Sequence, residues 1–262
     1  MSSPVRAASA IVGFVVLLTV CESSAAAPVP VRFAKGSAHA YLVLRDAQAR
    51  VIAQGDWWQT PHDDQIEVNL RFEFGDGSLS HETYVLSQRR VWTLLSYRSE
   101  QRGPSFPRDI EARVDRGSGR YTIRTKDRDD GSVDLDEGEI ELPADVYAFG
   151  PLAMLLESVR PGEGISGHAI AFTPKPRVLK LQITPGVEDR VAVEGTKRKI
   201  WRYVVNAKLE GLLGVGASIL GKQPPDMHYW MAGDPMPPFL RVDCPLYPEG
   251  PIWRVELAAP AW

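Results

Sequence analysis

The sequence has 262 residues and a formal charge of −3, with 44% hydrophobic and 24% charged residues. This composition is typical of a folded globular protein and excludes an intrinsically disordered chain. The near-neutral charge argues against a general nucleic-acid-binding protein, which needs a basic surface, so no nucleic-acid partner is expected.

Residues 1–27 are typical of a secretory signal peptide. Arg6 supplies the positive charge, Ile11 to Val20 form an apolar stretch, and Ala25 to Ala27 offer small residues for cleavage. An apolar run of about ten residues is too short for a membrane-spanning helix, which needs roughly 20. We expect cleavage near Ala27 and export to the periplasm or the medium, with a retained N-terminal anchor as the alternative. Residues 28–262 are then predicted to form a single β-rich domain.

The two cysteines bear on anchoring and on stability. Leu18 to Cys21 resembles the lipobox of bacterial lipoproteins, but Val20 stands where that motif needs a small residue. We therefore expect an ordinary cleaved leader rather than lipidation at Cys21, which would anchor the protein in a membrane. After cleavage Cys244 is the one remaining cysteine, so an intrachain disulfide is excluded and the core must supply the stability.

Strand-like sequence begins soon after the leader. A first strand is predicted from His39 to Asp46, followed by a broken segment that ends in a turn at 60–64. From Gln65 to Phe74, apolar and polar residues alternate without exception. This alternation places one face of a strand on a core and the other face in water.

A hairpin is predicted at Gly75 to Ser78, where the glycines can adopt a positive φ. The return strand, Leu79 to Ser87, carries Glu82, Tyr84 and Leu86 on one side and His81, Thr83 and Val85 on the other. Pro185 and Gly186 predict a further turn, whereas the glycine-rich stretch 212–220 is assigned neither to helix nor to strand. Other strand-like segments lie at 91–97, 111–114, 121–125, 133–142, 179–184, 201–209, 239–244 and 252–257.

One helix is predicted in the mature chain, between Gly150 and Arg160. Pro151 is favourable at a first helical position, and Arg160 followed by proline and glycine is typical of a helix end. The leucines, Met154 and Val159 cover most of its circumference, so the helix should be buried. We predict a mainly β fold, a curved antiparallel sheet or half-barrel with one short buried helix packed on its concave face.

The sequence carries no recognisable catalytic or metal-binding motif. Its five histidines are scattered, and the single mature cysteine excludes a thiolate zinc site. The acidic run that starts at Asp127 fails the EF-hand pattern, because Ser132 and Gly138 stand where glycine and glutamate are required. Gly216 to Leu220 fails the nucleophile-elbow pattern, because Leu220 stands where glycine is required. Gly214 and Gly216 fail the dinucleotide-binding pattern, because Ile219 stands where the third glycine is required. We therefore expect no enzyme, no metal and no cofactor.

The large apolar residues suggest a ligand type. They could all belong to an ordinary core, since such residues usually pack inside. They could also line a cavity between the concave sheet and the helix, because ligand pockets are mostly apolar with a few polar groups. On this interpretation the chain binds a lipid or acyl chain without a covalent bond. The predicted lining residues are Phe149, Leu152, Leu155, Leu156, Trp201, Tyr203 and Trp230.

Two short segments carry a resemblance to known proteins. Glu141 to Tyr147 (ELPADVY) and Gly250 to Glu256 (GPIWRVE), in a chain ordered as leader, meander, helix and meander, resemble uncharacterised bacterial periplasmic proteins of the DUF3108 type. The layout more distantly resembles the half-barrel lipoprotein carriers of the LolA/LolB kind. The resemblance implies a curved antiparallel sheet around a helix and an apolar cavity, and those carriers bind acyl chains. No individual functional residue is carried over, because no shared site motif is identifiable.

Two other functions stay open. If all apolar residues are core, the chain would be a structural or protein-interaction module of the bacterial envelope with no small-molecule ligand. Its working surface would be a strand edge or the proline-framed loop around Trp230, and its envelope partner and oligomeric state are not indicated by the sequence. A secreted hydrolase would require a cluster in space of His62, Asp63, Asp64 and His228.

Overall fold

The computed structural model describes residues 28–172, 175–193, 196–209, 224–233 and 239–258. The predicted leader with Cys21 and the stretch 212–220 lie outside these residues. The described elements are β1 (Ala38–Arg45), β2 (Val51–His62), β3 (Gln65–Phe74), β4 (Leu79–Ser87), β5 (Thr93–Arg102), β6 (Asp109–Asp115), β7 (Arg120–Lys126), β8 (Val133–Glu139), β9 (Val146–Tyr147), α1 (Leu152–Glu157), β10 (Ile165–Phe172), β11 (Pro176–Val193), β12 (Thr196–Lys208), β13 (Met227–Ala232), β14 (Phe239–Cys244) and β15 (Trp253–Leu257).

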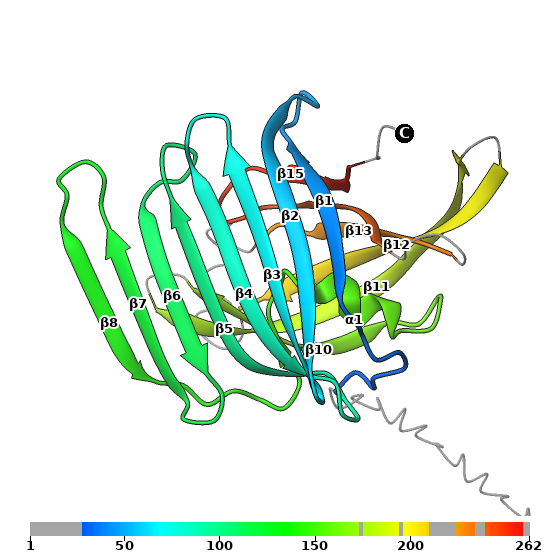
Figure 1. Ribbon diagram of the computed structural model, residues 1–262, viewed down its shortest axis with the longest axis horizontal. Helices are drawn as coiled ribbons and strands as arrows, with labels where there is room; N and C mark the ends of the chain where they lie inside the picture. Colours follow the sequence, from blue (N-terminus) through cyan, green and yellow to red (C-terminus); the bar gives the residue numbers. More distant parts are fainter. Residues whose placement is uncertain (1–27, 173–174, 194–195, 210–223, 234–238, 259–262) are drawn as a thin grey trace, which may run out of the picture.

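The strands form one sheet of two meanders that meet at β1 and β15. The 15 strands run in the order β8 to β1 and then β15 to β9. β1 pairs antiparallel with β15, with Leu42 opposite Leu257, and β9 pairs parallel with β10. In Figure 1 the first meander (blue to green) forms the front wall and the second curves behind it, with α1 between them. The predicted mainly β fold, with one short helix on the concave face, is confirmed.

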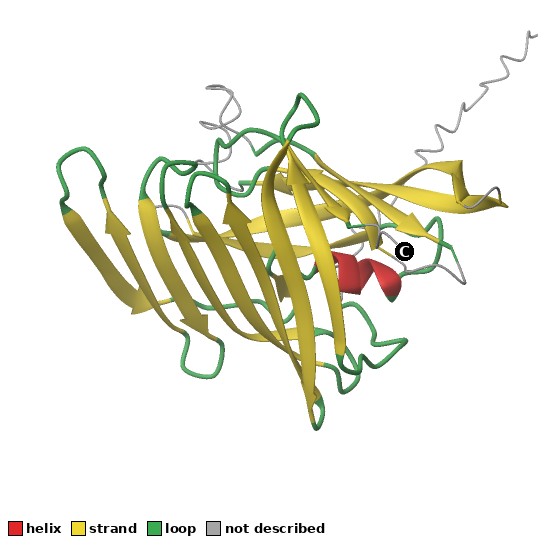
Figure 2. Cartoon of the chain, turned by 45° about the horizontal axis from the view of Figure 1, so that its top comes forward, coloured by secondary structure: helices red, strands yellow, loops and turns green. Residues whose placement is uncertain are grey.

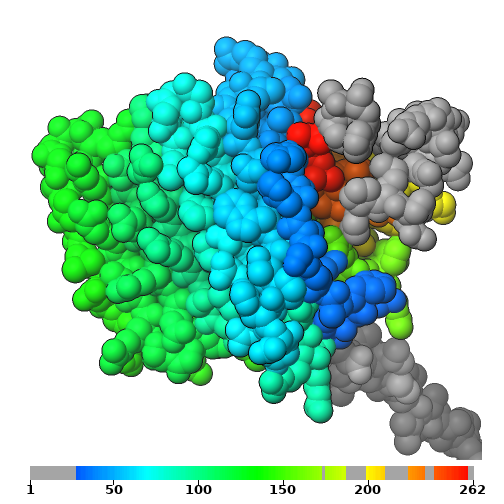
Figure 3. Space-filling model, viewed as in Figure 1, coloured from blue at the N-terminus to red at the C-terminus, as the bar shows by residue number. Residues whose placement is uncertain are grey.

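The core lies on the inner, concave face of the sheet. In β3, Ile66, Val68 and Phe72 are almost completely buried, whereas Glu67 and Glu73 point to the outer face. The alternation predicted for this strand is therefore confirmed, as are the hairpin and the return strand β4. Figure 3 shows the outer side chains of the first meander as one continuous surface.

Two predicted breaks are wrong, because strands continue through them. β2 runs unbroken from Val51 to His62, with Pro61 opposite Ile66 next to the hairpin turn. β11 continues through Pro185 and Gly186, where the register with β12 shifts instead of reversing. A bulge accommodates a proline in a sheet because it interrupts the ladder of main-chain hydrogen bonds. Proline and glycine thus mark a bend of the strand here rather than its end.

The helix is shorter than predicted and is buried inside the curve of the sheet (Figure 2). α1 spans six residues, and Pro151 precedes its first residue. Gly150 lies against Tyr84 of β4, because a Cβ added there would clash with the Tyr84 hydroxyl oxygen. This close approach fixes the start of α1 against the first meander. Within the described residues, no helix has the length and hydropathy needed to span a bilayer.

The segment Glu141 to Tyr147 joins the two meanders. The Arg116 guanidinium donates two hydrogen bonds of 2.9 Å to main-chain carbonyls of this segment. Asp145 lies 2.9 Å from the His168 ring nitrogen Nδ1 on β10. These contacts tie the loop before α1 to β10 and to the turn between β6 and β7, which gives the ELPADVY segment a structural role.

Candidate functional site

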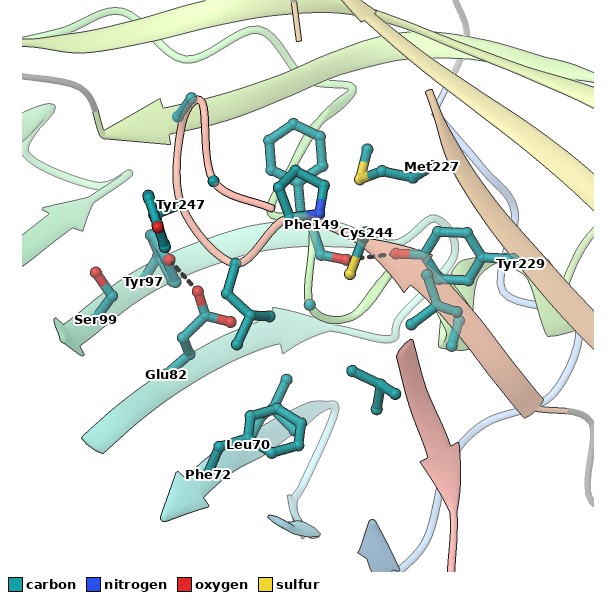
Figure 4. A pocket seen from close by; sticks show the side chains of 18 of the residues that line it. Leu70, Phe72, Glu82, Tyr97, Ser99, Phe149, Met227, Tyr229, Cys244 and Tyr247 are labelled. Carbon is teal, nitrogen blue, oxygen red and sulfur yellow. Dashed lines mark hydrogen bonds between the residues drawn. The ribbon is translucent and has the colours of Figure 1, made fainter. Parts of the chain in front are cut away.

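A cavity of about 1180 Å³ lies between α1 and the concave face of the sheet. Pockets for small molecules usually measure roughly 300–1000 Å³, so this space suits a large ligand. Its wall is formed by residues of both meanders, of α1 and of the loop after β14 (Figure 4). Apolar members of the wall include Trp57, Leu70, Phe72, Phe149, Met227 and Val242.

The register of the first meander explains why the wall is apolar. Ala40, Trp57 and Leu70 stand opposite one another on β1, β2 and β3, so they form one inward-facing row. All three line the cavity. The next residue of this row, on β4, is Glu82. A carboxylic acid therefore stands where the pattern leads us to expect another apolar side chain.

Glu82 belongs to a set of inward-facing polar residues on β4 and β5, which we call the polar ladder. The ladder consists of three cross-strand pairs, and cross-strand partners share one face of a sheet. Glu82, Tyr97, Ser99 and Gln101 of the ladder line the cavity. The pairs are Ser80 with Gln101, Glu82 with Ser99, and Tyr84 with Tyr97.

Two phenols hold the Glu82 carboxyl group. The Tyr97 hydroxyl donates a hydrogen bond of 2.7 Å to Oε1, and the Tyr84 hydroxyl donates to Oε2. The two tyrosine rings stack, with centroids 5.0 Å apart and an interplanar angle of 8°. Burial raises the pKa of Glu82 above its ordinary value, and these two hydrogen bonds oppose the rise only in part. Both neighbours are neutral, so neither compensates a negative charge on the carboxyl group.

Residues across the cavity from Glu82 are also neutral near pH 7. The Tyr229 hydroxyl donates a 3.2 Å hydrogen bond to the Phe149 carbonyl oxygen, as Figure 4 shows. Burial raises the pKa of the Cys244 thiol to about 12, with the charge of Glu82 as a further cause. A thiol of this kind is inert because it is not ionised. Cys244 therefore contributes to the wall as a small apolar residue.

A second carboxylate of the cavity wall, which α1 supplies, has a cationic partner. Glu157 forms an ion pair with Lys35, and both residues line the cavity. Burial lowers the pKa of Lys35. Among the described residues, by contrast, no lysine, arginine or histidine forms an ion pair or hydrogen bond with Glu82. Glu82 is thus distinguished from Glu157 by its neutral surroundings.

The loop that follows β14 closes part of the wall. Pro245 to Gly250 line the cavity, and the Gln101 side chain donates a 2.7 Å hydrogen bond to the Leu246 carbonyl oxygen. The Tyr247 ring packs against Phe106 and Trp253, with ring centroids 5.7 and 6.0 Å apart. These contacts anchor the loop to the polar ladder on one side and to an aromatic cluster on the other.

The face of α1 that lines the cavity is not the face that carries its leucines. Of the predicted lining residues before and within α1, Phe149 lines the cavity. Leu152, Leu155 and Leu156 are buried in the core and are not part of the described wall. They share one helical face at spacings of three and four residues, and the opposite face lines the cavity. Ala153, Met154 and Glu157 form that opposite face.

The predicted residues of the second meander are not part of the described wall. Trp201 and Tyr203 point to the inner face of β12, where Trp201 is half-buried and Tyr203 is buried in the core. Trp230 points to the outer face of β13, because Met227, Tyr229 and Met231 take the inward positions. The Arg241 guanidinium carbon lies 3.9 Å from the centroid of the Trp230 ring.

The residues considered for a hydrolase are not grouped. His62 and Asp63 lie at the hairpin between β2 and β3, and Asp64 pairs with Arg89. His228 lies beside Trp230 on the outer face of β13. In the described part of the chain, no three His, Cys, Asp or Glu side chains are grouped so as to hold a metal ion. The absence of enzymatic activity stays a prediction.

The candidate residue that the sequence analysis missed is Glu82. Its position on the same side of a strand as Tyr84 and Leu86 was the available signal, because a charged residue on an apolar face is unusual. The comparisons with known proteins add no further guide. No protein-family model, no curated protein and no solved structure matches the chain, so the site is interpreted from its own residues.

Proposed function

We propose that this chain is an exported protein of the bacterial envelope that binds a lipid or another apolar ligand non-covalently in the cavity. The observation that carries the proposal is the cavity of about 1180 Å³ with its mainly apolar wall. Burial of each ligand methylene in such a wall contributes about 0.8 kcal/mol, so an acyl chain needs no charged contact to be retained. The resemblance of the sequence layout to half-barrel lipoprotein carriers implies the same ligand class.

Binding can be tested by ligand retention and by dye uptake. Native mass spectrometry and solvent extraction of the purified chain should reveal a co-purifying lipid, and the apolar dye Nile red should gain fluorescence on entering the cavity. Replacement of Ala153 on the wall by phenylalanine should reduce dye affinity about tenfold, because the new ring occupies ligand space. Gln54→Phe, on the exposed outer face of β2, is the matched control and should leave uptake unchanged. Absence of both lipid and dye uptake in the wild type would reject the proposal.

Export is a separate part of the proposal. The leader with its apolar stretch and small residues supports removal of residues 1–27. Mass measurement of the protein recovered from a periplasmic extract should give a chain that begins close to Pro28. A lipidated N-terminus at Cys21, or an uncleaved leader, would contradict this part without affecting the cavity.

A second candidate function is that of an interaction module, and the edge strand β8 favours it. In the described sheet β8 pairs with β7 alone, and its Val133 and Leu135 are 52% and 57% exposed. An edge of this kind can accept a strand from another protein. The many acidic residues of β8 act in the opposite direction, because charges on an edge discourage such pairing.

A β8 variant distinguishes the two functions. Leu135→Lys should abolish co-purification of any envelope partner that binds through β8, while Nile red uptake stays as in the wild type. Loss of a partner together with an empty, dye-excluding wild-type cavity would favour the interaction module over ligand binding.

A further inference from the structure

The polar ladder places a group of polar side chains in a cavity wall that is otherwise mostly apolar. Most of the wall is apolar, and the uncharged Ser99 and Gln101 of the ladder resemble the few polar groups found in many ligand pockets. Glu82 differs from them because it is ionisable. Its row neighbours are Leu70 on β3 and Ser99 on β5, so no cation faces it from either adjacent strand. A ligand that fills the cavity therefore meets an acidic group part of the way along one wall.

The carboxyl group is both held in place and accessible to a ligand. One phenol donates to each of its oxygens, so the group has a fixed orientation. The residue is half-buried rather than fully buried, because part of its surface faces the cavity (Figure 4). Each carboxylate oxygen can accept more than one hydrogen bond, so both oxygens have capacity for a further donor.

Ionisable groups that face Glu82 from the surrounding elements do not supply a positive charge. Tyr84 and Tyr97 belong to the ladder, and Tyr229 and Cys244 interact with Glu82 electrostatically from β13 and β14. Burial is the main cause of a raised pKa in all four groups, so they are neutral near pH 7. The remaining charged residues of the wall are Lys35 and Glu157, which pair with each other, and Arg177 and Glu249.

We propose that Glu82 binds the polar end of the ligand, and that the ligand is an amphiphile with an ammonium group attached to an apolar body. The inference rests on the proposed ligand-binding function and specifies the chemical class of the ligand. An ammonium group supplies both hydrogen bonds and the positive charge that the phenols cannot supply. A fatty acid would place a second carboxylate beside Glu82, where repulsion between like charges is strong in an apolar cavity. A hydroxyl group would donate a hydrogen bond and leave the charge uncompensated.

A series of ligands with one chain length and different head groups tests the inference. The purified full chain is loaded with Nile red, and the dye is displaced by dodecylamine, dodecanol or dodecanoate below their micelle-forming concentrations. In the wild type, dodecylamine should bind about tenfold more tightly than dodecanol, since a charge-assisted hydrogen bond is stronger than a neutral one. Dodecanoate should bind most weakly. Glu82→Gln should bring amine and alcohol to within about twofold of each other while Nile red still binds.

Control measurements distinguish a failure of the proposed ligand-binding function from a failure of the inference about Glu82. Glu73→Gln removes an exposed carboxylate from the outer face of β3, and this variant should keep the preference for the amine. If Nile red does not bind to the wild type, the proposed function fails and the inference with it. If the dye binds and the wild type shows no preference for the amine, the inference alone is overturned. A preference that persists in Glu82→Gln also overturns it.

A pH series on the wild type tests the inference even if Glu82→Gln does not fold. An aliphatic amine stays protonated below about pH 10, like lysine. Lowering the pH through the titration range of Glu82 should therefore weaken dodecylamine binding and leave dodecanol binding unchanged. Equal pH dependence for the two ligands would contradict a role for the Glu82 charge.

Discussion

Two carboxylates of the same sheet have opposite surroundings. On the outer face of β14, Asp243 accepts hydrogen bonds from Arg241 and Arg254 at distances of 2.7 to 3.4 Å. Partial burial acts to raise the pKa of Asp243, but the two arginines outweigh it and hold the pKa below its ordinary value. On the inner face, Glu82 has two phenols in place of two arginines, and its pKa is raised. Asp243, which stabilises the sheet, is therefore paired with cations. Glu82, which lines the cavity, has no cationic partner among the described residues.

The largest expected effect on stability follows from removing the outer-face carboxylate of Asp243. Asp243→Asn should lower the free energy of unfolding by about 2 kcal/mol at neutral pH, because it leaves Arg241 without its carboxylate partner and Arg254 with Glu256 at 3.9 Å. The value is below that of a fully buried pair, since the Arg241 and Arg254 side chains are 28% and 36% exposed. Urea denaturation measures the change. The exposed Glu73→Gln should change stability by less than about 0.5 kcal/mol, and an equally small change in Asp243→Asn would contradict the prediction.

Neutralising the inner carboxylate of Glu82 should change the free energy of unfolding in the opposite direction. Without ligand, Glu82→Gln should raise the free energy of unfolding by about 1 kcal/mol at neutral pH, because a buried charge without a cation disfavours the folded state. The amide oxygen can still accept a hydrogen bond from one of the tyrosines. Urea denaturation of delipidated protein is the measurement. A loss of stability as large as that of Asp243→Asn would show that Glu82 is a structural residue like Asp243.

The two carboxylates should also respond to pH in opposite directions. Asp243 has a lowered pKa, so its stabilisation is present above the ordinary value for aspartate and is lost as the pH falls through its folded-state pKa. Glu82 has a raised pKa, so its destabilisation is absent below the ordinary value for glutamate and grows as the pH rises through its folded-state pKa.

Unfolding experiments between about pH 3 and pH 8 test both directions. The deficit of Asp243→Asn should shrink toward the acidic end of this range, and the advantage of Glu82→Gln should grow toward the alkaline end. Curves for the two variants that stay parallel to the wild type would show that neither carboxylate titrates differently in the folded state.

The smallest expected effect concerns the support of Arg241. Trp230→Leu removes the ring over which the Arg241 guanidinium lies, and it should cost about 0.5–1 kcal/mol. Part of that loss should disappear in the Arg241→Leu background, because the stacked pair no longer exists there. A double-mutant cycle measures this coupling, and purely additive effects would show that Trp230 does not support the cation near Asp243.

Local patterns predicted which residues share a face, but not where the faces lie in space. Alternation assigned β3 and β4 correctly, including the side of β4 that carries Glu82. The segment around Trp230 was predicted as a loop and forms strand β13 instead. Trp230 and Tyr229 point to opposite faces of this strand, although the aromatic character of Trp230 suggested an inward position. Proline and glycine were misleading at Pro61 and Pro185, since a strand end and a bulge tolerate them as well as a turn does.

The cavity itself could not be derived from periodicity. It depends on the pairing of β1 with β15 and on which face of α1 points inward, and both result from contacts between distant parts of the chain. The leucines of α1 were recognised as buried, but a helical pattern does not distinguish a face packed in the core from a face that lines a cavity. Glu82 could be recognised as a candidate binding residue from the structure alone, because the structure shows that its neighbours are neutral.

The junction of β1 and β15 has a consequence for how the protein is made. Arg45 of β1 and Glu256 of β15 are hydrogen-bonded although they are 211 positions apart in the sequence. During synthesis the first meander emerges long before its partner strand, so the middle of the final sheet is an open edge until β15 has been made. Pairings of such long range are slow to form, because the entropy of closing a large loop must be overcome first. Until β15 arrives, β1 should therefore be an unpaired strand edge at which the nascent chain can aggregate.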